Sequence, residues 1–207
     1  MQINVAGLLD DSNQIPSPNC DARPENTDIS LLVIHHISLP PEEFGGNGVI
    51  DLFTNQLDYD ARAYYQSLKA MRVSSHFFIR RTGEIIQFVP CLLRAWHAGA
   101  SCWQGQACCN DFSIGIELEG SDNQPFAPSQ YLQLTELTKS ILATYPIRDI
   151  AGHTTIAPQR KTDPGPHFDW QGYQQALLAR GISCDLTSQT TIAIHPIQPE
   201  GARQAQI

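Results

Sequence analysis

The most restrictive feature of the sequence is an unbroken apolar run at residues 31–37, Leu-Leu-Val-Ile-His-His-Ile, which is soon followed by Pro40 and Pro41. A run without polar alternation is typical of a central strand that is covered on both faces, and proline cannot continue such a strand. The chain is therefore expected to build layers on both sides of a sheet. His35 and His36 lie at the carboxyl end of this predicted strand.

The other predicted elements do not follow a regular βαβ alternation. In chain order they are helices at 48–57 and 60–71, a hairpin of 76–81 with 84–89, a strand at 112–119, a helix at 129–145, a strand at 149–151 and a helix at 169–180. Gly181 suits the cap that closes the last helix. The order predicts an α/β protein of the α+β type, with a mixed central β-sheet flanked by helices.

A length of 207 residues is enough for one core and short for two. Residues 1–30 are rich in Asn, Asp, Pro and Ser, which predicts an irregular N-terminal arm ahead of a folded domain at 31–181. Residues 182–207 are rich in Gln, Thr and Pro, which predicts a flexible C-terminal tail. Residues 90–111 are expected to form a long loop, and a loop of that length is usually functional.

The charge and hydropathy of the sequence limit which partners and which cellular compartment we expect. The chain has 13 Lys and Arg against 21 Asp and Glu, a net charge of −8, which argues against nucleic acid as a partner. The N-terminal residues lack the basic start of a signal peptide, and no apolar run approaches the roughly 18 residues of a membrane span. We therefore expect a cytoplasmic monomer that does not bind membranes.

The six cysteines are expected to remain thiols, because a cytoplasmic chain of this size seldom uses a disulfide framework. Cys91, Cys102, Cys108 and Cys109 include no pair with the spacing of a zinc knuckle, and two adjacent cysteines cannot easily both face one ion. The favoured interpretation is that they act as small buried hydrophobic residues.

Candidate metal ligands occur at three places: the pair His35-His36 at a strand end, His153 after a short strand, and Asp163. Two histidines and one carboxylate would leave one coordination position open, as a catalytic zinc requires. Glu117 on a neighbouring strand and Lys161 would supply a base and a cation beside the metal. Each histidine also has a structural interpretation, so the spacing alone leaves the metal site open.

Four sequence segments are more specific indicators of a protein family than the spacing of the candidate ligands. They are Ile-His-His-Ile-Ser-Leu-Pro-Pro-Glu-Glu-Phe-Gly-Gly at 34–46, Arg-Ala-Trp-His-Ala-Gly at 94–99, Cys-Asn-Asp-Phe-Ser-Ile-Gly-Ile-Glu-Leu-Glu-Gly at 109–120 and Arg-Lys-Thr-Asp-Pro-Gly at 160–165. In order and spacing they closely resemble the AmpD-type 1,6-anhydro-N-acetylmuramyl-L-alanine amidases, over about residues 16–175. The resemblance implies the N-acetylmuramoyl-L-alanine amidase fold that phage-type lysozyme amidases and peptidoglycan recognition proteins share, with zinc in a surface groove.

The resemblance also assigns roles. His35, His153 and Asp163 match the Zn²⁺ ligands of the family, Glu117 its catalytic acid/base, and Lys161 the basic residue beside the metal. Glu117 would take a proton from water and deliver it to the leaving L-alanine nitrogen, while Lys161 would stabilise the oxyanion at a carbonyl polarised by zinc. The implied substrates are small anhydro-muropeptides in the bacterial cytoplasm, released during peptidoglycan recycling.

Three further residues are candidate substrate contacts. Arg72 matches a family position that faces the stem peptide, although a solvated surface arginine is an equally good interpretation. Trp96 would lie against the sugar or else belong to the core, and His36 stands where the family usually has Asn. Cys108 and His167 also depart from the family pattern. These departures bear on substrate contacts and leave the metal triad intact.

Two alternatives remain from other functional classes. A non-catalytic peptidoglycan-binding module of the same fold typically lacks a zinc ligand, whereas all three ligands and Glu117 are present here. A mononuclear iron oxygenase also uses two histidines and one carboxylate, but usually with a close His-x-Asp/Glu pair that this chain does not contain.

Overall fold

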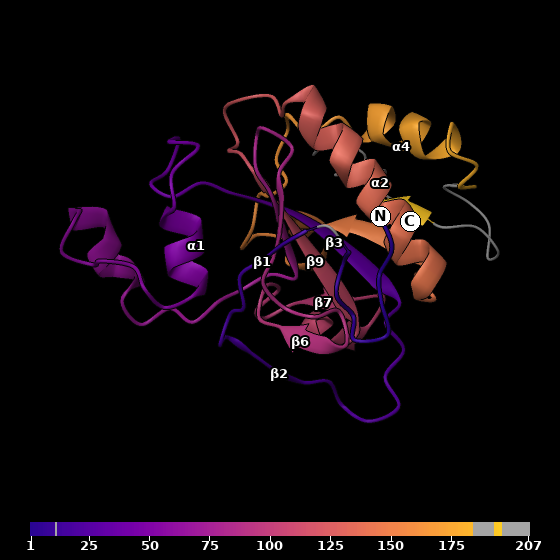
Figure 1. Cartoon of the computed structure of the whole chain (residues 1–207), viewed down its shortest axis with the longest axis horizontal. Helices are drawn as coiled ribbons and strands as arrows, with labels where there is room; N and C mark the ends of the chain where they lie inside the picture. The colour runs from indigo at the N-terminus through magenta and orange to yellow at the C-terminus, as the bar shows by residue number, and fades with distance from the viewer. Residues whose placement is uncertain (11, 184–192, 196–207) are drawn as a thin grey trace, which may run out of the picture.

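The computed structural model describes residues 1–10, 12–183 and 193–195, and it contains a mixed seven-stranded sheet (Figure 1). In spatial order the strands are β1 (Asn13–Gln14), β5 (Ile85–Gln87), β4 (Phe77–Ile79), β9 (Ser113–Glu119), β3 (Leu31–Ile37), β10 (Asp149–Gly152) and β11 (Ala193–His195). The hairpin pair β4–β5 is antiparallel, and the other neighbours pair in parallel. The predicted mixed sheet is confirmed.

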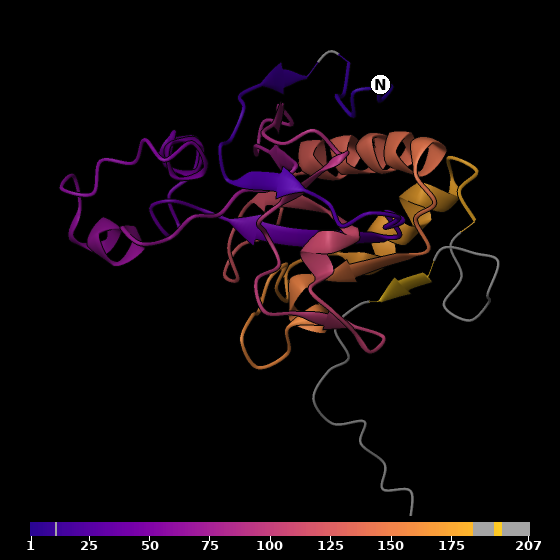
Figure 2. The ribbon, with the colours of Figure 1, turned by 90° about the horizontal axis from the view of Figure 1, so that it is seen from below.

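The central strand β3 contributes to the packing on both faces of this sheet, as its apolar run predicts. Leu32 and Ile34 point into the core layer beneath α2 (Pro128–Thr144) and α4 (Trp170–Leu178), two helices that lie side by side (Figures 1 and 2). Val33 points to the other face, because successive side chains of a strand alternate. The face that carries Val33 is also the one that carries His35.

The two long helices begin and end close to the predicted residues. Pro128 is the first residue of α2, a position where the missing N–H costs nothing. The Asp169 side chain caps α4 by accepting a hydrogen bond from the Gly172 N–H at 2.8 Å, an interaction typically worth about 1 kcal/mol. The buried hydroxyls of Thr138 and Tyr173 lie 2.6 Å apart and join α2 to α4.

The segment between β3 and β4 differs from the prediction of two α-helices. The helix α1 (Gly48–Phe53) ends before residue 57, and the second element, η1 (Ala63–Leu68), is a 3-10 helix. Tyr65 and Leu68 are the buried residues of η1, and a separation of three residues places both on one side of a 3-10 helix. Figures 1 and 2 show α1 to one side of the sheet, away from α2 and α4.

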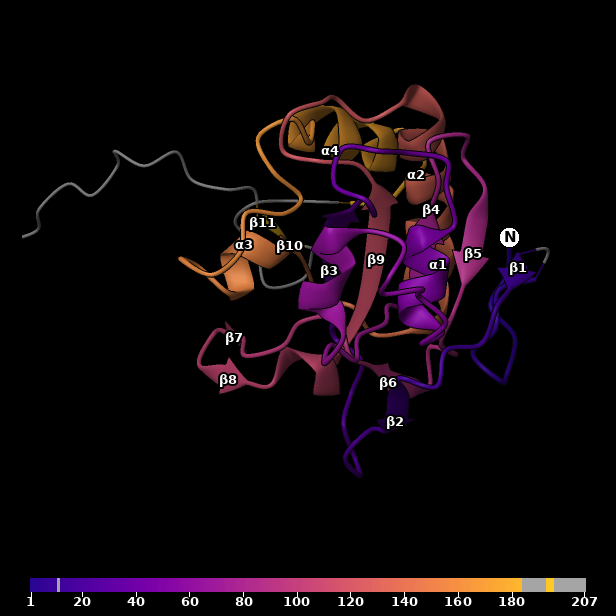
Figure 3. The same cartoon turned by 90° about the vertical axis from the view of Figure 1, so that its left-hand side faces the viewer.

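The region 90–111, predicted as a loop, contains short elements. They are β6 (Leu93–Ala95), which pairs with β2 (Cys20–Ala22), the two-stranded ribbon of β7 (Cys102–Trp103) with β8 (Gln106–Ala107), and the 3-10 turn η2 (Cys109–Asp111). Strands of two or three residues carry almost no periodic signal, which is why the pattern did not predict them. Figure 3 shows β2, β6, β7 and β8 at the end of the molecule opposite to α4.

The predicted N-terminal arm contributes β1 to the large sheet and β2 to a small one. The flexible tail predicted at 182–207 falls largely on 184–192 and 196–207, which lie outside the described residues, while β11 between them pairs with β10. Within the described parts of the chain, no helix has the length and apolar character needed to cross a membrane. The cysteines described there are free thiols, namely Cys20, Cys91, Cys102, Cys108 and Cys109.

Candidate active site

Strand register brings three distant side chains to one level at the carboxyl end of the sheet. In the parallel pairing of β3 with β9, His35 lies directly opposite Glu117. In the pairing of β3 with β10, Ile34 lies opposite Gly152, so His153 follows β10 at the level of His35. Ligands of α/β sheets commonly bind at this edge of parallel strands. The register therefore places a carboxyl group and two imidazoles where a site is expected.

Asp163 completes this group from the loop that follows the short helix α3 (His153–Ile156). The loop is held against the start of α3 by a hydrogen bond from the Thr154 N–H to the Asp163 carbonyl, at 2.8 Å. The three ligand atoms, His35 Nδ1, His153 Nδ1 and Asp163 Oδ2, lie 2.9 Å from one another. All three residues are buried, and together they form a group that could hold a metal ion.

Hydrogen bonds around the triad are compatible with a metal cation held between these atoms. The Nε2 of His153 lies 3.1 Å from the carbonyl oxygen of Ala98, which can only accept, so Nε2 carries a proton, and in the neutral ring Nδ1 presents a lone pair. That lone pair faces a carboxylate oxygen of Asp163, which is also an acceptor, at 2.9 Å. Two such groups at this distance are held together by a shared proton or by a metal cation. Two imidazole nitrogens and one carboxylate oxygen are a donor set that zinc prefers.

Burial and neighbouring groups set the protonation states of His35 and Asp163. Burial and the neighbouring His153 lower the pKa of His35 to about 4, so that its ring is neutral at pH 7. Burial alone would raise the pKa of Asp163, but its contacts with His153 and His35 outweigh this effect and hold that pKa below its usual range. A neutral imidazole and an ionised carboxylate are the forms that coordinate zinc.

Glu117 is buried beside the triad, and its Oε2 has no hydrogen-bond partner among the described residues. Burial raises the pKa of Glu117 well above its usual value, and the nearby Asp163 raises it further, while Lys161 lowers it. A carboxyl group with a raised pKa and an unengaged oxygen is suited to transferring protons near neutral pH. Lys161 is itself exposed.

His153 and Asp163 of the triad, together with Glu117, open onto a pocket of about 150 Å³, whose lining does not include His35. Besides Glu117, His153 and Asp163, the pocket is lined by His36, Ile37, Leu52, Phe53, Met71, Val73, Ser74, His97 and Lys161. Titratable groups are therefore combined in this lining with apolar side chains from α1 and from the segment ahead of β4. Such a combination suits a ligand that has both polar and apolar parts.

His36 lines this pocket without facing the triad. Its Nε2 lies 3.0 Å from Asp122 Oδ1, and the other oxygen of Asp122 accepts a hydrogen bond from the Thr162 hydroxyl at 2.6 Å. Asp122 thus connects the end of β3 to the loop that carries Lys161 and Asp163.

The other two candidate substrate contacts lie outside the immediate lining. The indole N–H of Trp96 donates to Asp21 at 3.2 Å, which holds the half-buried ring toward β2. The exposed guanidinium of Arg72 donates to nearby backbone carbonyls, including that of Met71 at 2.8 Å. Met71 and Val73 line the pocket, while Arg72 between them does not. Cys108 and His167 are also exposed and absent from the lining.

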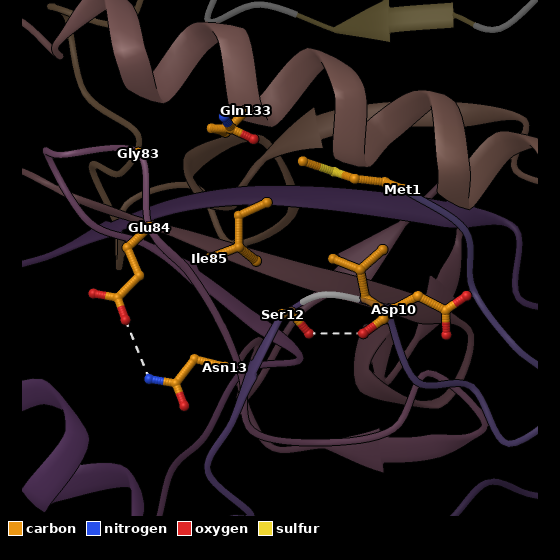
Figure 4. A pocket seen from close by; sticks show the side chains of 9 residues that line it. Met1, Asp10, Ser12, Asn13, Gly83, Glu84, Ile85 and Gln133 are labelled. Carbon is orange, nitrogen blue, oxygen red and sulfur yellow. Dashed lines mark hydrogen bonds between the residues drawn. The ribbon is translucent and has the colours of Figure 1, made fainter.

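A larger hollow of about 400 Å³ lies elsewhere, between the start of the chain and α2 (Figure 4). Its labelled residues are Met1, Asp10, Ser12, Asn13, Gly83, Glu84, Ile85 and Gln133. Asn13 donates to Glu84 across it at 3.1 Å. None of the candidate catalytic or metal-binding residues lines this hollow, so size alone does not identify the site.

Comparison with known proteins gives a matching family. A family model described as N-acetylmuramoyl-L-alanine amidase matches residues 25–166. The match covers more than half of the chain and includes the triad, Glu117 and Lys161.

Among curated proteins, the chain is 50% identical over 183 residues to the 1,6-anhydro-N-acetylmuramyl-L-alanine amidase AmpD of Salmonella typhimurium, which covers 87% of this chain and 97% of the relative. It is 55% identical over 170 residues to the AmpD of Haemophilus influenzae, over 81% of this chain and 92% of the relative.

Solved structures agree with these sequence matches. The crystal structure of a selenomethionine derivative of AmpD superposes with a TM-score of 0.83 at 49% identity, and covers 86% of this chain and 99% of that one. The amidase AmiD of Escherichia coli, solved in complex with anhydro-N-acetylmuramic acid-L-Ala-D-γ-Glu-L-Lys, superposes with a TM-score of 0.54 at 34% identity. That match covers 74% of this chain and 60% of AmiD.

Proposed function

Since the chain belongs to the N-acetylmuramoyl-L-alanine amidase family and is an amidase of that class, we propose that it uses Zn²⁺ to hydrolyse the amide bond between (1,6-anhydro-)N-acetylmuramic acid and L-alanine. In this proposal residues 31–181 form the amidase domain of a cytoplasmic monomer, whose substrates are small muropeptides from peptidoglycan recycling. The observation that carries the proposal is the convergence of His35, His153 and Asp163 beside Glu117.

His35, His153 and Asp163 are the residues that would hold zinc. Three protein ligands leave one position open, as catalytic zinc sites require. When bound, zinc supplies Lewis-acid polarisation of the scissile carbonyl and brings the pKa of water to about 7. The 2.9 Å spacing of the three ligand atoms and the lone pair on His153 Nδ1 support this assignment.

Glu117 moves the proton in the proposed reaction. Its carboxylate takes a proton from the attacking water and then delivers it to the nitrogen of L-alanine as the amide bond breaks. The raised pKa of Glu117 and its unengaged Oε2 support this role. Lys161, which lines the same pocket, stabilises the negative charge that develops on the carbonyl oxygen.

The substrate contacts divide between the pocket and its surroundings. His36 lies in the lining and would bind a polar group of the sugar or peptide. Arg72 would bind a stem-peptide carboxylate after its guanidinium leaves the backbone carbonyls that it now contacts, and Trp96 would lie against the sugar. The ligand in the AmiD complex is an anhydro-N-acetylmuramyl peptide with the same chemical parts, which supports an anhydro-muropeptide as substrate.

A non-catalytic binding module of the same fold is less well supported. A buried carboxyl group costs stability when one of its oxygens has no hydrogen-bond partner, as is the case for Glu117 Oε2 among the described residues. Glu117 is such a group, and a module that only binds peptidoglycan gains nothing from it.

Removal of the metal tests the zinc requirement. Treatment with a strong chelator followed by gel filtration is expected to abolish amide hydrolysis, because no residue of the pocket replaces the Lewis acid. Stoichiometric Zn²⁺ should restore the rate. The rate is measured from release of the free stem peptide, with a sample of the same preparation that is gel-filtered without chelator as control. Undiminished hydrolysis in a sample shown to be free of metal would rule out zinc dependence.

A further inference from the structure

His97 lies beside the triad, yet the proposed reaction gives it no task. Its Nδ1 lies 2.9 Å from Nε2 of His35, and its own Nε2 lies 3.1 Å from the hydroxyl of Ser113. The Ser113 hydroxyl in turn donates to the backbone carbonyl of Cys109 at 2.5 Å. We call the chain of hydrogen bonds from the Cys109 carbonyl through Ser113 and His97 to His35 the His97 relay.

The donors and acceptors of the His97 relay have one consistent order. A carbonyl oxygen only accepts, so the Ser113 hydrogen points to Cys109 and its oxygen accepts from Nε2–H of His97. His97 is buried, and none of its hydrogen bonds in the described structure is to a carboxylate, so its ring is neutral. Its Nδ1 then has a lone pair that accepts from Nε2–H of His35. His35 is left with a free lone pair on Nδ1, the atom that faces the rest of the triad.

We propose that His97 is a positioning residue, which selects the tautomer of His35 whose Nδ1 is free to bind the metal. The inference rests on the proposed function for the identity of the metal as zinc. Metal-binding histidines commonly donate their second N–H to a fixed acceptor, which orients the ring and makes the ligand atom more basic.

The neighbouring residue acts on the second histidine of the triad. The Ala98 carbonyl accepts from Nε2–H of His153, so two consecutive residues provide the acceptors for both metal-binding rings. Their backbone is fixed by Asn110, whose side-chain oxygen accepts from the N–H of His97 at 3.1 Å and from that of Ala98 at 2.7 Å. The loop that contains them is therefore shaped to hold both rings.

The strand beneath His97 leaves room for its ring. A Cβ atom at Gly115 of β9 would lie only 2.5 Å from Cγ of His97, so a larger residue would displace the imidazole. The rings of His35 and His97 meet edge to face, with centroids 5.0 Å apart. The 2.9 Å hydrogen bond between the two rings requires the His97 imidazole to lie close against the backbone of β9. A glycine at position 115 provides the space for it.

Two substitutions of His97 distinguish a positioning role from a space-filling role. His97→Phe keeps an aromatic ring and removes the acceptor, while His97→Asn places an amide oxygen near the position of Nδ1. We expect His97→Phe to weaken Zn²⁺ binding about 10- to 100-fold, and His97→Asn to recover most of that loss. Zn²⁺ affinity is measured on the metal-free full chain by competition with a chromogenic chelator. His167→Phe, the same change at an exposed histidine outside the pocket lining, is the matched control and should bind like the parent.

A side-chain NMR measurement reads the tautomer directly. In the zinc-loaded parent, the imidazole ¹H–¹⁵N correlations of His35 should show a proton on Nε2 that exchanges slowly with water, and this protection should be lost in His97→Phe. Unchanged affinity in His97→Phe, or equal losses in His97→Phe and His97→Asn at equal unfolding temperature, would overturn the proposal in favour of a space-filling role.

Ser113→Ala decides the matter if neither His97 variant folds, because it interrupts the relay and leaves both rings in place. Weaker Zn²⁺ binding than in the parent supports the relay, and parent-like binding overturns it. All these affinities are measured without substrate. A parent that binds zinc but hydrolyses no muropeptide would therefore contradict the proposed function while leaving the result for His97 valid.

Discussion

Replacing Asp163 with alanine is expected to abolish stoichiometric zinc binding and to lower amide hydrolysis by orders of magnitude. The change removes the carboxylate of the triad and leaves the two imidazoles of His35 and His153, whose Nδ1 atoms then share no anionic partner. The loss should exceed the roughly 100-fold that removal of an outer hydrogen bond costs a metal site. Metal content after gel filtration and the rate of stem-peptide release, measured on the same sample, test this result.

His36→Asn is the matched control for Asp163→Ala. Side chains alternate along β3, so His35 faces the triad while His36 faces Asp122, with which an asparagine amide could still form a hydrogen bond. The variant should keep its zinc and most of its affinity for substrate, whereas His35→Asn should lose the metal. Full zinc content in Asp163→Ala, or loss of zinc from His36→Asn but not from His35→Asn, would show that the triad is assigned wrongly.

Replacing Glu117 with glutamine or alanine is expected to leave zinc in place and to lower turnover about 10²- to 10⁴-fold, the usual contribution of a general acid/base. Glutamine keeps the size of the side chain but cannot take a proton from water. Because Glu117 is adjacent to the triad and not part of it, the metal content should equal that of the parent. The test compares kcat with zinc content and unfolding temperature for each variant.

The pH dependence of stability distinguishes a catalytic role of Glu117 from a structural role. Burial raises the pKa of Glu117 above its ordinary value of 4.5, which means that ionisation of this group disfavours the fold. The stability of the metal-free parent relative to Glu117→Gln should therefore be greatest below pH 4.5 and should fall as the pH rises toward the raised pKa. Parallel losses of zinc, stability and activity in Glu117→Gln would instead make Glu117 a ligand or a structural residue.

The parts of the fold that could be predicted are those with a long apolar pattern. The run at 31–37 predicted a strand covered on both faces, and β3 occupies those residues and packs on both sides of the sheet. The amphipathic helix predicted at 129–145 is α2, shifted by one residue. In these segments many side chains report the same period, so one deviation does not change the prediction.

The parts that could not be predicted depend on tertiary contacts. The strands β7 and β8 have two residues each, too few to show a period. The 3-10 form of η1 depends on the burial of both Tyr65 and Leu68 on one side of the helix. Propensity for an α-helix or a 3-10 helix differs little over six residues, so packing decides between them.

For the site, the spacing of His35, His153 and Asp163 left the metal open, and the resemblance of local motifs assigned it. The structure adds the register that sets His35 opposite Glu117 and brings together residues more than a hundred positions apart. No role for His97 could be predicted from the sequence, although the residue lies inside one of the motifs. Its role depends on the direction of hydrogen bonds to His35 and Ser113, which no sequence pattern contains.

The central claim, cleavage between N-acetylmuramic acid and L-alanine, is tested most directly by the masses of the reaction products. The zinc-loaded full chain is incubated with an anhydro-N-acetylmuramyl peptide, and the mixture is analysed by mass spectrometry beside a Glu117→Gln sample. We expect two products, anhydro-N-acetylmuramic acid and a free stem peptide that begins with L-alanine, whose masses sum to that of the substrate plus one water. An intact substrate, or fragments from cleavage at any other bond, would contradict the proposed function.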